Sequence, residues 1–293
     1  MNPHFSHTYL LVNPKSGSYS ENRLHSVLQR LQEHQISPEV FHVQTPTEIG
    51  ECCRGITLEQ TSPLVIVAGG DGTFNVVVNS VAPKTVTLAV LPFGTSNVLA
   101  AEIGITSIDD GINRIITGNS KLLSLGVIEC EGKTLRFVLM AGIGLDGATV
   151  RGVTSWGKRV FRQGAYGWSA LKCVLAWDQS LFTVRTPTER ITCHSAIICN
   201  AARYGGNFIL SPESSPFIHG LKAFCITSNR RRTYLTIIRD LFCGKKQRST
   251  NLHLLSETSI WIDGTKAIQV DGDFIGHAPA RITTEPDFAR MIQ

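Results

Sequence analysis

The residues best suited to chemistry form the run GGDGT at 69–73, directly after an apolar stretch at 64–68. Glycines at a turn from strand to helix let the backbone approach a polyphosphate closely, and amides at the start of a helix attract its negative charge. Asp71 itself would repel phosphate, so its candidate tasks are holding Mg²⁺ indirectly, positioning a hydroxyl or accepting a proton. The alternative is a tight turn in which Asp71 only caps the following helix.

Two similar loops follow other apolar stretches, NPKSGS at 13–18 and PFGTSN at 92–97. In an open parallel sheet, the loops after successive strands gather at the carboxyl edge, where ligands bind. Three polar, glycine-bearing loops at that edge favour a phosphate ligand over a plain turn. The GxxxxGK[ST] spacing of P-loop nucleotide hydrolases is absent, so the predicted site is of another design.

The elements that must position these loops alternate between strands and helices over residues 1–121. This order predicts an α/β domain with a parallel sheet covered by helices. The predicted strands are residues 8–12, 39–43, 64–68 and 87–91, and the predicted helices are residues 23–31, 75–81 and 108–117.

Residues 122–293 change to short β-prone segments separated by turn glycines, which predicts an antiparallel β domain. We expect its last residues to pack back on the first domain. The predicted strands are 122–130, 135–141, 182–184, 195–200, 223–227, 259–262 and 267–270, and the two predicted helices are 163–177 and 233–242.

The composition is that of a globular enzyme, with 42% hydrophobic and 17% charged residues in a chain of 293. Residues 1–7 lack the features of a secretory signal, and no window approaches 18 uninterrupted apolar residues. The 8 cysteines form no CxxC pair, so we expect reduced thiols and neither a zinc site nor a disulfide framework. These features predict a cytoplasmic protein.

The net charge of +5 is concentrated in residues 229–248, which hold seven basic residues against the single acid Asp240. The helix predicted at 233–242 carries apolar residues at helical spacing among these charges. Such a helix could lie on anionic lipid during a transient membrane visit. It could equally be an ordinary helix packed on the β domain with solvated charges. No nucleic-acid-binding motif accompanies the charge, so nucleic acid is not a predicted partner.

Several segments in order resemble the diacylglycerol kinase catalytic-domain family, which includes bacterial lipid kinases and sphingosine kinases. GGDGTFNVVVN at 69–79 is similar to the family's GGDGTxNEVVNG, and LPFGTSNVLA at 91–100 to its LPxGTxNxxA. The further matching segments are NPKSG at 13–17, GIGLDG at 142–147, the glycine pair near 205 and VDGD at 270–273.

The resemblance implies a Rossmann-like ATP domain and a β-sandwich lipid domain, with the active site in the cleft between them and ATP bound with Mg²⁺. Catalysis would involve Asp271, Asp273 and Asp71, with Asp271 or Asp273 as the proton acceptor. The implied nucleotide-binding residues are Asn13, Lys15, Ser16, Gly17, Thr45, Gly69, Gly70, Asp71, Gly72, Thr73, Asn75, Gly94, Thr95 and Asn97.

Asp271 and Asp273 have two structural interpretations. In an extended segment both side chains would point the same way and could serve one site. Alternatively, Asp271 and Gly272 form a β-turn between strands, since Asp-Gly is a favoured turn dipeptide. The spacing favours the turn, whereas the resemblance favours a functional pair.

Three departures from the family pattern stand out. Val76 replaces a glutamate, and Asp273 replaces the glutamate of DGE. Residues 216–220 read PFIHG where relatives carry an acidic segment that holds a structural Mg²⁺, so the metal ligands are left open, with Glu213 and His219 as substitutes or plain surface residues.

The leading hypothesis is an ATP-dependent lipid kinase that phosphorylates diacylglycerol or a related lipid. The alternatives are an enzyme similar to NAD kinases and a non-catalytic lipid-binding relative. A homodimer is compatible with the sequence, which does not identify the lipid.

Overall fold

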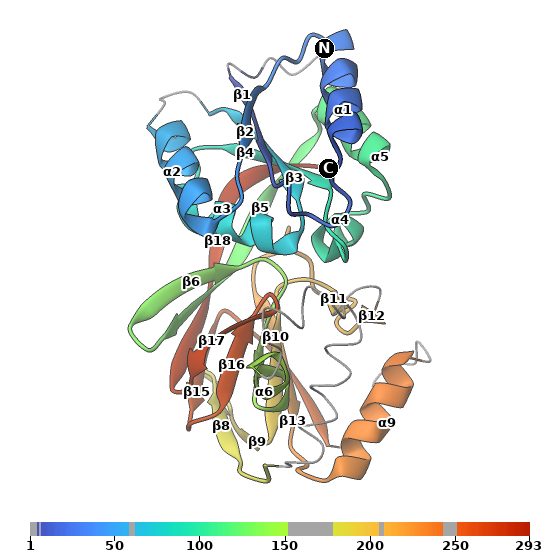
Figure 1. Cartoon of the computed structure of the whole chain (residues 1–293). Coiled ribbons are helices and arrows are strands. Elements are labelled where there is room, and N and C mark those ends of the chain that lie inside the picture. Colours follow the sequence, from blue (N-terminus) through green and yellow to red (C-terminus); the bar gives the residue numbers. More distant parts are fainter. Residues whose placement is uncertain (1–4, 6, 59–61, 152–177, 205–207, 243–250) are drawn as a thin grey trace. The chain divides into compact units, whose positions relative to one another are not determined.

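The computed structural model describes the chain except residues 1–4, 6, 59–61, 152–177, 205–207 and 243–250 (Figure 1). The helix predicted at 163–177 lies outside the described residues. The chain divides into two compact units. Unit 1 comprises Met1–Leu125 and Glu285–Gln293, and unit 2 comprises Gly126–Tyr204 and Phe208–Thr284. The chain passes from unit 1 to unit 2 inside one strand, β5, which also contains the expected boundary after residue 121.

Unit 1 is an α/β domain built on a parallel sheet with the strand order β2-β1-β3-β4 (Figure 1). The last residues of β18 extend this sheet, because Arg290 and Met291 pair in parallel with the start of β4. The elements are β1 Thr8–Val12, α1 Glu21–Glu33, β2 Glu39–His42, α2 Pro46–Thr57, β3 Leu64–Gly69, α3 Asp71–Ser80, β4 Thr87–Pro92, α4 Val98–Glu102 and α5 Ile108–Thr117.

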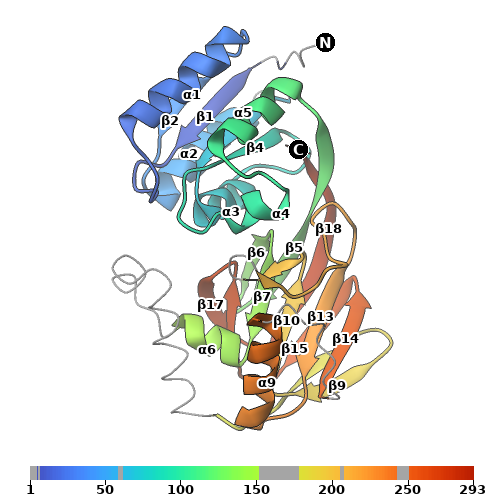
Figure 2. The same cartoon turned by 90° about the vertical axis from the view of Figure 1, so that its right-hand side faces the viewer.

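Helices cover both faces of this sheet, with α1 beside α5 on one face and α2 beside α3 on the other (Figures 1 and 2). Every residue of β3 is buried, as a central strand covered on two sides requires. Local capping residues start the helices. Ser20 caps α1 by accepting from Arg23 N, and Ser107 caps α5 by accepting from Asp110 N.

Unit 2 is a β-sandwich of two sheets. One is wholly antiparallel with the order β14-β13-β10-β7-β16-β17, and the other joins β5, β6, β8, β9, β15 and the start of β18. Their inner faces share one apolar core. The elements are β5 Ser120–Cys130, β6 Lys133–Phe137, β7 Met140–Ile143, α6 Leu145–Arg151, β8 Phe182–Arg185, β9 Arg190–Cys193, β10 Ser195–Cys199, β11 Arg203–Tyr204, β12 Phe208–Ile209, β13 Leu221–Ile226, α9 Arg231–Phe242, β14 Leu252–Glu257, β15 Ser259–Asp263, β16 Ala267–Val270, β17 Asp273–His277 and β18 Ala280–Ile292.

The predicted fold class is confirmed, whereas the single strand predicted at 135–141 is wrong. The chain leaves one sheet after Phe137 and enters the other at Met140. Between them the amides of Val138 and Leu139 donate to the Asp271 carboxylate and not to a neighbouring strand. A tertiary contact therefore interrupts a segment that reads as continuous.

Candidate active site

The carboxyl ends of β1 and β3 mark the position in unit 1 where a ligand is expected. In the order β2-β1-β3-β4, the chain leaves β1 towards one edge of the sheet and continues from β3 towards the other. Open α/β sheets bind ligands at such a switch point, outside the carboxyl ends of the strands. The loops at 13–18 and 70–73 flank this point.

Hydrogen bonds fasten the three polar loops to one another. Asn13 Nδ2 donates to Thr73 Oγ1 at 2.9 Å, which joins the β1 loop to the β3 loop. Ser18 N donates to Phe93 O at 2.9 Å, and Gly94 N donates to Gly69 O at 3.1 Å. The loops after β1, β3 and β4 thus form one connected corner, as the sequence predicts.

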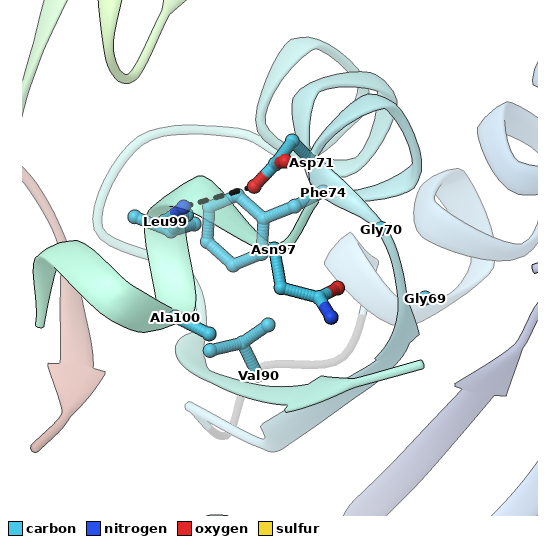
Figure 3. Close-up of a pocket in the computed structure, with 8 residues that line it drawn as sticks. All are labelled: Gly69, Gly70, Asp71, Phe74, Val90, Asn97, Leu99 and Ala100. Atoms are coloured by element: carbon cyan, nitrogen blue, oxygen red, sulfur yellow. Dashed lines mark hydrogen bonds between the residues drawn. The ribbon is translucent and has the colours of Figure 1, made fainter. Parts of the chain in front are cut away.

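Asp71 closes this corner with its carboxylate. Its Oδ2 accepts from Val98 N at 3.0 Å. Its Oδ1 accepts from Leu99 N at 2.9 Å, the bond drawn in Figure 3. These amides begin α4, directly after Asn97, whose backbone is left-handed with φ 47°. Asp71 therefore caps a helix, but the helix is α4 and not α3, the helix that Asp71 begins.

Two glycines of the corner differ in what surrounds them. A Cβ on Gly94 would stand 2.5 Å from the Gly70 Cα, so the close approach of the two loops requires glycine there. A Cβ on Gly72 would meet no atom within 4 Å. Gly72 lies exposed in the first turn of α3, where an anion would meet helix amides.

The hollow between these loops is small. It leaves essentially no room for a water molecule and is lined by Gly69, Gly70, Asp71, Phe74, Val90, Asn97, Leu99 and Ala100 (Figure 3). Ligand pockets usually have roughly 300–1,000 Å³. The hollow therefore belongs to the packing behind the loops, whereas Lys15, Gly17, Gly72 and Thr95 lie on their exposed side.

Other predicted nucleotide-binding residues have internal partners. Thr45 caps α2 by accepting from Glu48 N at 3.2 Å. Asn13 Oδ1 accepts from Lys15 N at 2.9 Å, and Ser16 N donates to Asn13 O. Asn75 Oδ1 accepts from Asn79 Nδ2 at 3.1 Å. These contacts orient the loops, and a contact with nucleotide stays a prediction.

In unit 2 the segment with Asp271 and Asp273 is a tight turn, so the extended interpretation is wrong. Val270 pairs with Asp273 across the antiparallel hairpin of β16 and β17. Asp271 and Gly272 between them both have positive φ, 46° and 89°. This is the backbone that a two-residue hairpin loop requires, and it explains the Asp-Gly sequence. Asp273 begins β17 and is exposed.

The Asp271 carboxylate holds the chain that enters β7. Its Oδ2 accepts from Val138 N at 2.8 Å, and its Oδ1 accepts from Leu139 N at 3.0 Å and Met140 N at 2.9 Å. The backbone of Asp271 also donates to Met140 O at 3.0 Å. Asp271 is therefore fixed in position by partners more than 130 residues away in the sequence.

A second carboxylate supports this turn, and sequence reasoning did not single it out. Asp146 accepts from Tyr204 Oη at 2.5 Å and from Gln269 Nε2 at 2.7 Å. The oxygen of the same Gln269 amide, Oε1, accepts from Gly272 N at 2.8 Å. Desolvation raises the Asp146 pKa, although both hydrogen bonds oppose that shift. The available signal was the matching segment at 142–147, which contains Asp146.

Metal ligands are not evident in the described part of the chain. No three His, Cys, Asp or Glu side chains there gather as they would around a metal ion. Near the altered segment at 216–220, Glu213 is exposed and lies 3.6 Å from Lys222 Nζ. Among the described helices, none is both long enough and apolar enough to cross a bilayer.

Comparisons with known proteins agree with this architecture. Residues 7–128 match the model of the diacylglycerol kinase catalytic domain, and residues 140–293 match that of the YegS C-terminal NAD kinase beta sandwich-like domain. The diacylglycerol kinase of Bacillus subtilis is 29% identical over 140 residues, which cover 46% of this chain and 45% of that protein. A Shewanella frigidimarina protein, named probable lipid kinase YegS-like, is 27% identical over 219 residues, or 71% of this chain and 68% of that protein.

A solved structure shares the fold over almost the whole chain. The crystal structure of a diacylglycerol kinase from Bacillus anthracis, strain Sterne, has a TM-score of 0.74 at 20% identity. The match covers 98% of this chain and 97% of that chain. With the glycine-rich corner of unit 1 and the β-sandwich of unit 2, these matches place the chain in the diacylglycerol kinase catalytic-domain family of lipid kinases.

Proposed function

We propose that this protein transfers the γ-phosphate of ATP, bound with Mg²⁺, to the hydroxyl of diacylglycerol or a related lipid. The observation that carries the proposal is the corner of three loops, joined by hydrogen bonds at the switch point of unit 1. Phosphoryl transfer depends mainly on positioning and on neutralising charge, and a corner of fixed backbone amides suits both needs.

The exposed side of the corner fits a polyphosphate. Gly72 leaves open space in the first turn of α3, and Lys15 supplies a cation on the β1 loop. We assign the phosphates to these two loops, with Gly17 and Thr95 beside them. No side chain within 4 Å fills the space that a Cβ on Gly72 would occupy.

Asp71 fits an indirect contact with Mg²⁺. A carboxylate offers about four lone-pair positions, and the amides of Val98 and Leu99 take two of those on Asp71. The remaining capacity suits a water from the shell that Mg²⁺ usually keeps in nucleotide sites. When bound, the ion would neutralise charge on the phosphates.

Asp271 is our proposed acceptor for the proton of the lipid hydroxyl. Three backbone amides fix its carboxylate, and a general base must be held in a defined orientation. Asp273 is exposed at the start of β17, beyond the turn that the amides fix. Its proposed role is secondary, as a hydrogen-bonding group near the turn.

The test is a phosphoryl-transfer assay with labelled ATP, Mg²⁺ and neutral detergent micelles. Separate micelles carry diacylglycerol, sphingosine, ceramide, phosphatidylglycerol or a polyprenol, and NAD serves as a soluble control. Label in diacylglycerol or another of these lipids is the expected result. Label in NAD alone, or no transfer to any acceptor, would refute the proposal.

A further inference from the structure

Helix α9 of unit 2 is attached to the sandwich through a buried tyrosine. Tyr234 is only 7% exposed, and its hydroxyl lies 2.6 Å from His194 Nδ1 and donates to Ser195 Oγ at 2.8 Å. His194 and Ser195 are themselves buried at the junction of β9 and β10. This contact determines which side of α9 faces the protein.

The remaining surface of α9 combines cations with one large apolar side chain. Arg231, Leu235 and Arg239 are spaced four residues apart and therefore lie along one stripe of the helix. Leu235 is 64% exposed, and Arg232 is exposed beside the stripe. Arg239 is 67% exposed and pairs with its neighbour Asp240, the one acid of α9. We call Arg231, Arg232, Leu235 and Arg239 the α9 surface.

The arginines stand where they oppose helix stability. The first turn of α9 contains Arg231 and Arg232 and no acid, although the positive end of the helix dipole favours acids there. Arg230 precedes them and is exposed. The cations and the helix dipole therefore both make the potential at this end of α9 positive, and this arrangement lowers the stability of the helix. Sequences usually break such local rules for function.

We propose that the α9 surface docks on anionic phospholipid, with the arginines at the headgroups and Leu235 inserted at the boundary of the acyl chains. A basic helix with an exposed apolar residue is suited to that interface. Nucleic acid would match the cations but would leave Leu235 against charged phosphates. The inference goes beyond the proposed reaction, because docking needs neither ATP nor turnover.

The hairpin of β11 and β12 supplies a second apolar residue beside this helix. β12 contacts α9 within unit 2, and its Ile209 is 53% exposed. Large exposed apolar side chains in two neighbouring elements extend the surface that could enter the interface. The basic residues Lys245, Lys246 and Arg248 follow in the sequence but lie outside the described residues.

Cosedimentation with vesicles tests the docking without using kinase activity. The full chain is mixed with vesicles of phosphatidylcholine alone or with added phosphatidylglycerol. Binding is expected only to the anionic vesicles and should weaken as salt screens the charges. Arg231→Gln/Arg232→Gln should lower the partition coefficient by about 25-fold, because each cation contributes about fivefold near an anionic surface.

A matched pair of substitutions controls for net charge. Lys133→Gln/Arg190→Gln removes the same charge from exposed positions on β6 and β9 and should leave vesicle binding unchanged. Leu235→Ser should weaken binding by about tenfold, since insertion of the leucine is lost. Leu58→Ser, at a position 84% exposed in unit 1, should have no effect.

The docking proposal would be overturned by equal binding to neutral and anionic vesicles, or by equal losses for the two charge-removing pairs. Displacement from vesicles by duplex DNA at comparable concentrations would also overturn it. Phosphoryl transfer in neutral detergent micelles separates this surface from the reaction, because Arg231→Gln/Arg232→Gln should keep wild-type activity there. Failure to bind vesicles with intact micellar activity would refute only the docking.

Discussion

Asp71 in unit 1 and Asp271 in unit 2 use the same physical device in different settings. Each carboxylate accepts backbone N–H groups and thereby fixes a separate segment of the chain. Asp71 reaches 27 and 28 residues along the chain, to the loop after the next strand. Asp271 reaches back 131 to 133 residues, to the entrance of β7.

The difference lies in what each carboxylate holds. Asp71 joins two loops that the parallel sheet already brings to one edge, so it completes an arrangement that strand order imposes. Asp271 joins a hairpin turn to the segment that crosses from β6 to β7. Its carboxylate, and not a neighbouring strand, accepts from the amides of Val138 and Leu139. We therefore expect the loss of Asp271 to destabilise the fold more than the loss of Asp71, and each prediction below tests that ranking or its basis.

The largest expected loss of stability comes from Asp271→Ala, about 3 kcal/mol or more in unfolding free energy. Three amides lose an acceptor, and each unsatisfied buried donor costs about 1–3 kcal/mol. Alanine also tolerates the left-handed φ of 46° less well than aspartate or asparagine. Asp271→Asn keeps one acceptor oxygen and should lose less. Urea unfolding followed by circular dichroism measures both changes.

Asp273 supplies the control for that turn. Because the Asp273 side chain is exposed, Asp273→Ala should change the unfolding free energy by less than about 0.5 kcal/mol. Equal losses at the two positions would contradict the fastening role of Asp271. In the transfer assay, an inactive but folded Asp271→Asn protein beside an active Asp273→Asn protein would support Asp271 as the proton acceptor.

Gly94→Ala should rank second, with a loss of about 1–3 kcal/mol. The added Cβ would meet the Gly70 backbone at 2.5 Å, and backbone cannot yield as a flexible side chain does. The same variant should bind nucleotide less well, because the loops separate. Thermal unfolding together with titration of ATP measures the two effects, and an unchanged melting temperature would show that the loops are not fixed against each other.

Asp71→Ala should cost about 1 kcal/mol, the usual loss for a helix cap. Only the two amides at the start of α4 lose their acceptor, whereas three amides lose theirs when Asp271 is removed. Asp71→Asn should recover part of the loss. A larger effect here than at Asp271 in the same urea experiment would reverse the ranking.

The turn of unit 2 should also carry a pH dependence through Asp146. Its pKa is raised from the ordinary 3.8 because burial disfavours the charged form, so the folded state holds this proton more tightly than the unfolded state. The stabilisation is full below pH 3.8 and is lost as pH rises through the folded pKa. Relative to Asp146→Asn, the wild-type unfolding free energy should therefore fall as pH rises. A constant difference between about pH 4 and 7 would contradict this.

No loss of stability is expected for Gly72→Ala. Nothing lies within 4 Å of the added Cβ, and alanine is favoured over glycine in a helix by about 1 kcal/mol. If polyphosphate occupies this space, ATP binding should nevertheless fall clearly. The comparison with Gly94→Ala is decisive, because Gly94 is required by the fold and Gly72 is proposed to serve a ligand. Unimpaired ATP affinity in Gly72→Ala would move the phosphate site elsewhere.

Much of unit 1 was predictable from the sequence because its signals are local. The strands β1, β3 and β4 are short apolar runs, and each ends at a polar glycine-bearing loop. Helix α2 was missed although Thr45, Pro46 and Glu48 form a recognisable start signal with an N-cap, a first-turn proline and a capping acid. The start of α2 is therefore encoded locally in the sequence, as the strands are.

Other elements could not be predicted in the same way. β18 contains Pro286, which is unfavourable within a strand, and the two ends of β18 pair with different strands, β15 and β4. The split between β6 and β7 depends on the Asp271 carboxylate. Gln269 accepts from Gly272 N and is itself held by a hydrogen bond to Asp146. Each of these features requires partners far away in the sequence.

The sequence by itself determined the two fold classes and the convergence of the three polar loops, and its spacing favoured the Asp-Gly turn, because periodicity, glycine placement and turn chemistry act over a few residues. Only the tertiary structure decided which amides Asp71 and Asp271 hold, which glycine is sterically required and which face of α9 is exposed. Those outcomes depend on packing and hydrogen bonding between segments far apart in the sequence, and a local sequence pattern does not indicate which distant residues will be partners.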